Sequence, residues 1–355
     1  MSFLKKLDWK LLLSVTLLLV LGLLSLLSTA PDLFYKQIIW IVISVLVGVF
    51  LIVIDLRSFF SRKSIVFSFY WLVIGVLVLT YFLAPQIKGN RAWIILGSFQ
   101  FQPSELAKIA LIIVLSYFLS RRHIGIARWG IFFSSFFYGF FPALLIAIQP
   151  DLGSALVVGA VWAGFVLISG LPLKKVFISA LVLIVSLVLI WSYVLKDYQK
   201  ERIAGLFNPQ EDPLGINYNV IQSKIAIGSG GLFGKGFGQG TQVQLGFLPE
   251  AQTDFIFAAI AEEGGFLAII VLCLAFMGMI LRILKIGLSS EANFYKFLSL
   301  GSVILFLTQF ILHVGSNLGL LPVIGVTLPF VSYGGSSILS SMILVGMIQS
   351  AYSKK

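Results

Sequence analysis

The chain has 355 residues, of which 59% are hydrophobic and 11% are charged, and its formal net charge is +11. Apolar runs of about 20 residues recur along its whole length, which excludes a soluble globular protein and predicts a polytopic membrane protein. The basic residues are not gathered on a polar domain that could follow a phosphate backbone, so we expect no nucleic-acid partner. A single cysteine, Cys273, excludes an internal disulfide and a thiolate metal site.

Ten apolar segments are long enough to cross about 30 Å of hydrocarbon as helices. The first, Leu11–Ser28, is longer than the apolar core of a signal peptide. The others are expected at 37–54, 65–84, 103–120, 130–149, 152–171, 175–195, 254–284, 297–314 and 336–352. We therefore predict an all-α polytopic membrane protein with about ten transmembrane helices in a single integral membrane domain over residues 1–355.

The distribution of basic residues indicates how these helices are oriented. With ten spans both termini lie on one side, and most Lys and Arg residues of the connecting segments, such as Arg121 and Arg122, fall on that side. The positive-inside rule then predicts that both termini are cytoplasmic. It places one large loop, at about 196–253 before the eighth helix, on the extracytoplasmic side.

A short outer loop carrying Arg91 and Trp93 precedes the fourth span, which begins near Pro103. Lys108 lies one turn deeper than Glu105 on the same helix face, and a charge at membrane depth is costly unless it is paired or functional. Two interpretations stay open. One is a structural ion pair between Glu105 and Lys108, and the other is a cationic site for an anionic headgroup, tuned by Glu105.

Two further polar residues favour structural interpretations. Asp151, in the sequence IQPDLGS, is placed to cap the helix that follows it. His313 lies within an apolar span with no second His or Cys nearby, so a hydrogen bond between helices is favoured over a metal site.

The stretch 228–240 is rich in glycine but is not typical of a nucleotide site. It has no Gly-Lys-Ser/Thr ending and no preceding strand, and its predicted side of the membrane lacks ATP. Glycine could supply tight turns in a flexible re-entrant loop. Alternatively, backbone N–H groups there could form a nest for a lipid-linked phosphate.

The apolar segment after the large loop begins at Asp254, and Ala258, Ala261 and Gly265 follow on the same helical face. This strip of small side chains predicts either the close approach of a neighbouring helix or a groove for an isoprenoid chain that ends at Asp254.

Two more acidic residues, Glu262 and Glu263, lie about two turns deeper in that segment. Either could hold Lys108 or Arg91 by charge attraction, and the sequence does not indicate which of the two faces the bundle.

Several long blocks of this sequence resemble the SEDS family of shape, elongation, division and sporulation proteins. The blocks are KGNRAWI, FQPSELAK, QPDLGSA, NPQEDPLG, QSKIAIGSGGLFGKGFG, LPEAQTDFIFAAIAEEGG and NLGLLPVIGVTLPFVSYGGSS. They occur in the family's order and cover essentially the whole chain, and the short amino-terminal tail is more similar to elongation members than to division members. Ala251 and Gln252 depart from the Gln-His type pair of relatives, so no role is expected there.

The resemblance implies a peptidoglycan glycosyltransferase that polymerises lipid II on the outer face of the bacterial cytoplasmic membrane. It also implies a class B penicillin-binding protein as the transpeptidase partner, and it places the family's essential aspartate on Asp254. A divalent cation, Mg²⁺ or Mn²⁺, is implied by the family only, since no ligand cluster in this sequence demands one.

The chemistry of such a transfer requires a single base. The acceptor C4 hydroxyl must lose a proton, whereas the departing polyprenyl pyrophosphate is already a stable anion. We expect Asp254 to be the general base of an inverting transfer, because no nucleophile for a covalent intermediate is evident. The residues expected to bind the substrate are Lys108, Glu105, Arg91, Trp93, Arg202 and Glu262.

Two other functions stay open at this point. Charges within the spans and helices broken at Pro150 and Pro322 would suit a lipid II flippase, although no inverted repeat is visible. A non-catalytic scaffold of the elongation or division machinery is the third possibility. Purified protein that lengthens lipid II in detergent would distinguish the enzyme from both.

Overall fold

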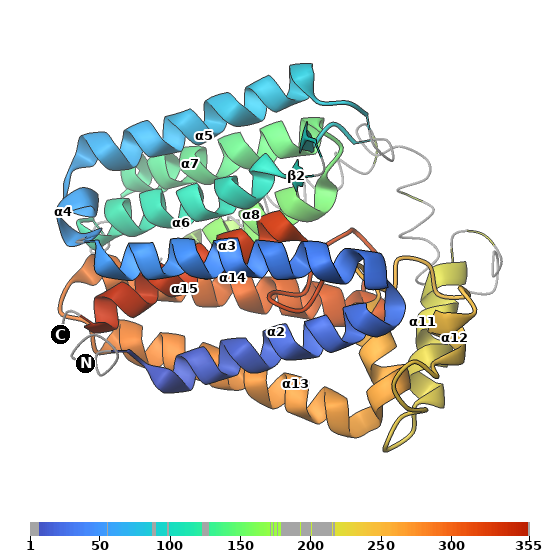
Figure 1. The fold of residues 1–355 in the computed structure, drawn as a ribbon. Helices are drawn as coiled ribbons and strands as arrows, with labels where there is room; N and C mark the ends of the chain where they lie inside the picture. Colours follow the sequence, from blue (N-terminus) through green and yellow to red (C-terminus); the bar gives the residue numbers. More distant parts are fainter. Residues whose placement is uncertain are drawn as a thin grey trace.

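Long helices lie side by side, and both chain termini are at the same end of the bundle (Figure 1). This computed structural model describes residues 7–54, 56–86, 90–97, 99–122, 128–170 and 217–353, with isolated positions between 172 and 215. The helices of the bundle are α2 (Trp9–Thr29), α3 (Pro31–Val53), α5 (Lys63–Leu83), α6 (Pro103–Ser120), α7 (Trp129–Ile148), α8 (Leu152–Ile168), α13 (Ile256–Leu288), α14 (Asn293–Asn317) and α15 (Gly335–Ser353). The shorter elements are α4 (Leu56–Ser61), β1 (Ile94–Leu96), β2 (Phe99–Phe101), α11 (Tyr218–Ser229) and α12 (Thr241–Gln244).

The helices confirm the predicted all-α polytopic architecture. Seven of them are long and apolar enough to cross a membrane, and α8 is a shorter apolar helix of 17 residues. The 19 residues of α15 also coincide with a predicted span. The span predicted at 175–195 falls almost wholly outside the described residues, as does Arg202.

A small hairpin stands between α5 and α6, where the sequence predicts only a loop. Strands β1 and β2 pair antiparallel, with Ile94 opposite Phe101. Gly97 in the turn has a φ of 63°, a left-handed conformation that glycine adopts without steric cost. The hairpin leads directly into Pro103, so it fixes the point at which α6 begins.

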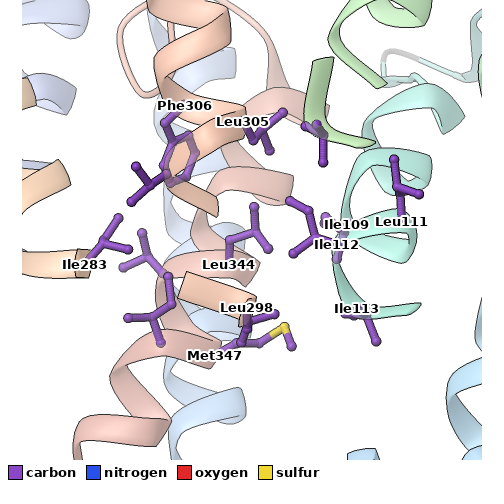
Figure 2. Close-up of a cluster of buried hydrophobic side chains, with 14 of the residues drawn as sticks. Ile109, Leu111, Ile112, Ile113, Ile283, Leu298, Leu305, Phe306, Leu344 and Met347 are labelled. Carbon is purple, nitrogen blue, oxygen red and sulfur yellow. The ribbon is translucent and has the colours of Figure 1, made fainter. Parts of the chain in front are cut away.

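Helix α6 is the centre of the bundle. Nearly all of its residues are buried, and it packs against α5, α7, α8, α14 and α15. Figure 2 shows Ile109 of α6, Leu298 of α14 and Leu344 of α15 within one cluster of buried side chains. Because lipid chains are as apolar as these residues, van der Waals packing holds the helices together. Any charged residue on α6 is therefore enclosed by other helices.

Helix α13 consists of two helical segments that meet at Gly265, which has a φ of 67° and a ψ of −167°. Residues 256–263 before the kink are buried, whereas the longer segment after it exposes apolar side chains such as Leu274. The span predicted at 254–284 is present, but the sequence analysis did not anticipate the kink within it. Gly265 does not continue the face of Ala258, because the helix changes direction there.

The glycine-rich loop fills this kink. The N–H groups of Lys235 and Gly236 donate to the carbonyls of residues 262 and 263 at 2.9 and 3.1 Å. In return, the N–H groups of residues 266 and 267 donate to the carbonyls of residues 231 and 232 at 2.9 and 3.2 Å. The kink frees these polar groups, and the loop pairs them, as a membrane protein requires. The N–H groups of Lys235 and Gly236 are engaged within the protein, so they do not belong to the predicted phosphate nest.

The fit of the loop against α13 can be tested at Gly230. A Cβ atom at this position would lie 2.0 Å from the carbonyl oxygen of Ala261. Gly230→Ala should therefore lower the Tm of the purified protein by at least about 2 °C, because overpacking costs about 1–3 kcal/mol. Gly228→Ala is the matched control, since nothing lies within 4 Å of its added Cβ. Equal Tm values for the two variants would contradict the close approach.

Candidate functional site

Asp254 lies in the turn just before α13, with a partly exposed side chain. The helix begins at Ile256, two residues later than the sequence predicts. Phe255 and the residues of α13 before its kink are buried. Asp254 therefore lies at the border between this buried segment and the more exposed turn.

The backbone of this turn is held by the last residue of α14 and by the segment that joins α14 to α15. The carbonyls of residues 252, 253 and 254 each accept one hydrogen bond from that part of the protein. The donors are the Tyr333 N–H, the Ser332 hydroxyl and the Asn317 side-chain amide, at 2.9, 2.9 and 2.8 Å. Partial burial also raises the pKa of the Tyr333 phenol, which stays neutral at physiological pH.

The segment between α14 and α15 is largely non-helical, and side chains from other helices bond its backbone. The imidazole Nδ1 of His313 is 2.9 Å from the Val326 carbonyl oxygen. Gln37 of α3 donates to the Ser332 carbonyl at 3.2 Å and accepts from the Gly334 N–H at 3.3 Å. His313 therefore makes a hydrogen bond inside the bundle, as expected, but its partner is this segment and not another helix.

A buried ion pair lies near the start of α6. The Nζ atom of Lys108 is 2.6 Å from Glu105 Oε1, and both side chains are almost completely buried. Ser340 of α15 donates to the other carboxylate oxygen of Glu105 at 3.0 Å. The pair predicted from the i, i+3 spacing is thus present, and every charged atom of Glu105 has a partner.

Asp151 caps α8 as predicted, by accepting a hydrogen bond from the Ser154 N–H at 3.1 Å. It also accepts from the Gln102 side chain at 2.8 Å, while the Gln102 N–H donates to Ser336 Oγ at 2.9 Å. The amino-terminal ends of α6, α8 and α15 therefore meet beside the Glu105–Lys108 pair. Helix amino termini carry partial positive charge, and at the start of α8 the Asp151 carboxylate already offsets part of it.

The meeting point of these three helices is also connected to the turn that carries Asp254. Ser332 bonds that turn, and Ser336 bonds the start of α6. Because these two serines are four residues apart, their Cα atoms are separated by at most about 14 Å. The turn of Asp254 and the starts of these three helices are therefore joined by one short stretch of chain.

The two acids of α13 have other partners than the sequence predicts. Glu262 is fully buried and pairs with Lys235 at 2.7 Å, and not with Lys108 or Arg91. Its oxygens also accept from the Gln242 and Val243 N–H groups and the Thr241 hydroxyl, at 2.9, 3.2 and 3.3 Å. Glu263 accepts from Ser28 and Gln244 at 2.5 and 3.1 Å. The pairing with Lys108 or Arg91 is therefore wrong, because the glycine-rich loop and α12 bond Glu262, and α2 and α12 bond Glu263.

The remaining predicted substrate residues are distributed as follows. Arg91 is exposed and Trp93 is half-buried in the segment before β1, and Arg202 lies outside the described residues. Sequence reasoning missed Asn317 and Ser332, although both belong to one of the quoted sequence blocks, where polar residues follow an apolar span.

A protein-built metal site is not evident in the part of the chain that the structure describes. No three His, Cys, Asp or Glu side chains come together within those residues. Mg²⁺ usually takes one or two carboxylates and completes its shell with phosphate oxygens and water. Such an ion would therefore take most of its ligands from a bound pyrophosphate and from water.

Comparisons with known proteins agree on one family. The family model FTSW_RODA_SPOVE, described as "Cell cycle protein", matches residues 6–355. The chain is 38% identical over 275 residues to "Peptidoglycan glycosyltransferase MrdB" of Escherichia coli, covering 76% of this chain and 72% of the relative.

Two solved structures have the same fold over nearly the whole chain. One, reported as "Structural coordination of polymerization and crosslinking by a peptidoglycan synthase complex", contains a chain with a TM-score of 0.83 and 31% identity, covering 98% of both chains. The other is the Rod shape determining protein RodA of Thermus thermophilus, with a TM-score of 0.73 and 27% identity, covering 98% of this chain and 96% of that one.

The buried pair of α6 gives a prediction for stability. Lys108→Met leaves the Glu105 carboxylate buried without its cation, and Glu105→Gln leaves the Lys108 ammonium without its anion. Each single change should cost about 3–5 kcal/mol and lower the Tm clearly. The double change leaves no unpaired charge and should recover most of the loss, as measured by thermal unfolding in detergent. A double variant whose Tm loss equals the sum of the two single losses would contradict this.

Proposed function

Because the chain belongs to the FtsW, RodA and SpoVE family of cell cycle proteins, we propose that it is a peptidoglycan glycosyltransferase that polymerises lipid II with Asp254 as its general base. The observation that carries the proposal is the fixed turn of Asp254 next to the meeting point of three helix amino termini. The printed names of curated relatives support an enzyme over a flippase or a non-catalytic scaffold.

Two features of Asp254 support its assignment as the base. The residue is only partly buried, and its backbone is held by Asn317. In the transfer, the carboxylate takes the proton of the acceptor C4 hydroxyl as the new glycosidic bond forms to the anomeric carbon of the donor. The bond between that carbon and the pyrophosphate breaks, and the polyprenyl pyrophosphate leaves as an anion. One displacement inverts the anomeric centre.

The leaving pyrophosphate is best placed near the starts of α6, α8 and α15. Their positive ends and the Lys108 ammonium stabilise negative charge that grows during the reaction, and burial strengthens that interaction. Glu105 neutralises Lys108 in the resting protein and so keeps the cation ready at membrane depth. Arg91 and Trp93 contribute to substrate binding from the outer loop, and Arg202 is proposed to join them.

The role of Glu262 follows from its partners. The hydrogen bonds that its carboxylate accepts come from the glycine-rich loop and from α12. We assign it to substrate binding through that loop, which it holds in place. A divalent cation, Mg²⁺ or Mn²⁺, would supply further charge stabilisation at the pyrophosphate when bound.

The chain is a multi-pass membrane protein, and the distribution of basic residues supports an extracytoplasmic active site. A structural relative belongs to a peptidoglycan synthase complex. We propose a class B penicillin-binding protein as the partner of this chain, in the elongation machinery.

Replacement of Asp254 tests the proposed base. Asp254→Asn preserves the shape of the side chain but cannot accept the proton, so glycan polymerisation from lipid II should fall at least about 100-fold. Binding of lipid II should stay close to normal. Asp32→Asn is the control, because Asp32 is an exposed acid in the first turn of α3, and its loss should leave the rate unchanged.

Two outcomes would overturn this assignment. A near-normal rate for Asp254→Asn would exclude Asp254 as the base. A variant that no longer binds lipid II would indicate that Asp254 holds the pyrophosphate through a cation. The stable double variant of Glu105 and Lys108 adds a further test, since it should remain inactive if Lys108 stabilises the leaving group.

The orientation of the site can be tested by thiol labelling. Ser229 at the end of α11 and Ser289 after α13 are both exposed, and Cys273 is first changed to Ala. In intact cells an impermeant thiol reagent should modify Ser229→Cys but not Ser289→Cys. The reversed pattern would place the large loop in the cytoplasm and remove the proposed extracytoplasmic chemistry.

A further inference from the structure

The turn of Asp254 depends on one buried amide side chain from α14. We propose that Asn317 is a positioning residue for Asp254, which sets where its carboxylate meets the acceptor hydroxyl. This inference rests on the proposed role of Asp254 as the base.

Asn317 is the last residue of α14 and is completely buried. Its Nδ2 atom donates to the Asp254 carbonyl and to the His313 carbonyl, both at 2.8 Å. Its Oδ1 atom accepts from the Ala258 N–H at 3.2 Å. The two carbonyls need a donor and the N–H needs an acceptor, so only one orientation of the amide satisfies all three groups.

These contacts explain why α13 begins after Asp254 and not at it. In a regular helix the Ala258 N–H would donate directly to the Asp254 carbonyl, four residues earlier. Here the Asn317 amide stands between these two groups and bonds both of them. Asp254 is thereby kept out of the first helical turn, and its position is set relative to α14 as well as to α13.

The neighbouring contact to Ser332 acts on the same turn. Its hydroxyl donates to the Thr253 carbonyl at 2.9 Å and accepts from the Leu328 N–H at 3.0 Å. Ser332 holds the preceding residue, whereas Asn317 holds Asp254 itself. Loss of Ser332 should therefore have the same kind of effect on the reaction, but a smaller one.

Loss of the Asn317 amide is expected to slow the chemical step. Asn317→Ala frees the Asp254 carbonyl and the Ala258 N–H, which can then pair directly and draw Asp254 into the helix. A displacement of about 1 Å can cost up to about 100-fold in rate, so we expect kcat to fall about 10- to 100-fold. The KM for lipid II should change by less than about 3-fold, because the binding groups are untouched.

Ser223→Ala is a matched control for this change. Ser223 is also fully buried, and its hydroxyl donates to the backbone carbonyl of Asn317 at 2.8 Å. Its loss removes a hydrogen bond to the same residue without touching the turn of Asp254. The kcat of this variant should stay within about 2-fold of the wild-type value.

A double-mutant cycle separates positioning from general stability. Polymerisation is measured for Asn317→Ala, for Asp254→Asn and for the double variant, with lipid II binding measured for each. If Asn317 acts through Asp254, its change should cause no further loss once the carboxylate is gone. Ser332→Ala provides the same kcat and KM comparison if Asn317→Ala does not fold.

The outcomes distinguish this inference from the proposed function. Three results would overturn the positioning role alone. They are a normal kcat for Asn317→Ala, a loss of lipid II affinity as large as the loss of kcat, and a double variant whose loss is the product of the two single losses. If Asn317→Ala does not fold, a normal kcat for Ser332→Ala would overturn the positioning role. A near-normal rate for Asp254→Asn would overturn the assignment of the base.

Discussion

The backbone of a membrane protein cannot leave its polar groups unpaired, and the site of this protein depends on how that constraint is met. At one end of the bundle, the kink of α13 and the segment between α14 and α15 depart from regular helix. The backbone of the glycine-rich loop pairs the polar groups at the kink, and side chains such as Gln37 and His313 bond the backbone of the segment. The end of α14 and this segment also hold the turn of Asp254.

The electrostatics of the site follow from the same arrangement. Lys108 is paired with Glu105, so the pair contributes little net charge to the interior. The starts of α6, α8 and α15 add partial positive charges that are fixed by the fold, and the buried Asp151 carboxylate offsets part of them.

The sequence could predict those features that depend on local spacing. The length of apolar runs predicts the spans, the i, i+3 spacing predicts the pair in α6, and the position of Asp151 predicts its cap. The kink at Gly265 was not predicted, because the residues EEGG at 262–265 were interpreted as part of one continuous span. The partner of Glu262 was missed because Lys235 is 27 residues away in the chain. Asn317 was missed because an amide that bridges two backbone groups leaves no periodic signal.

The separations along the chain also set an order of assembly. The loop and the kink of α13 join residues 27 positions apart, whereas Asn317 and Ser332 reach back 63 and 79 positions to the turn of Asp254. Short loops close at lower entropic cost than long ones, so the loop can dock on α13 before the last two helices have been inserted. A nascent or truncated chain that ends before α14 carries Asp254 but has nothing to place it. The conformation of this turn is thus complete only when α14 and the segment after it are in place.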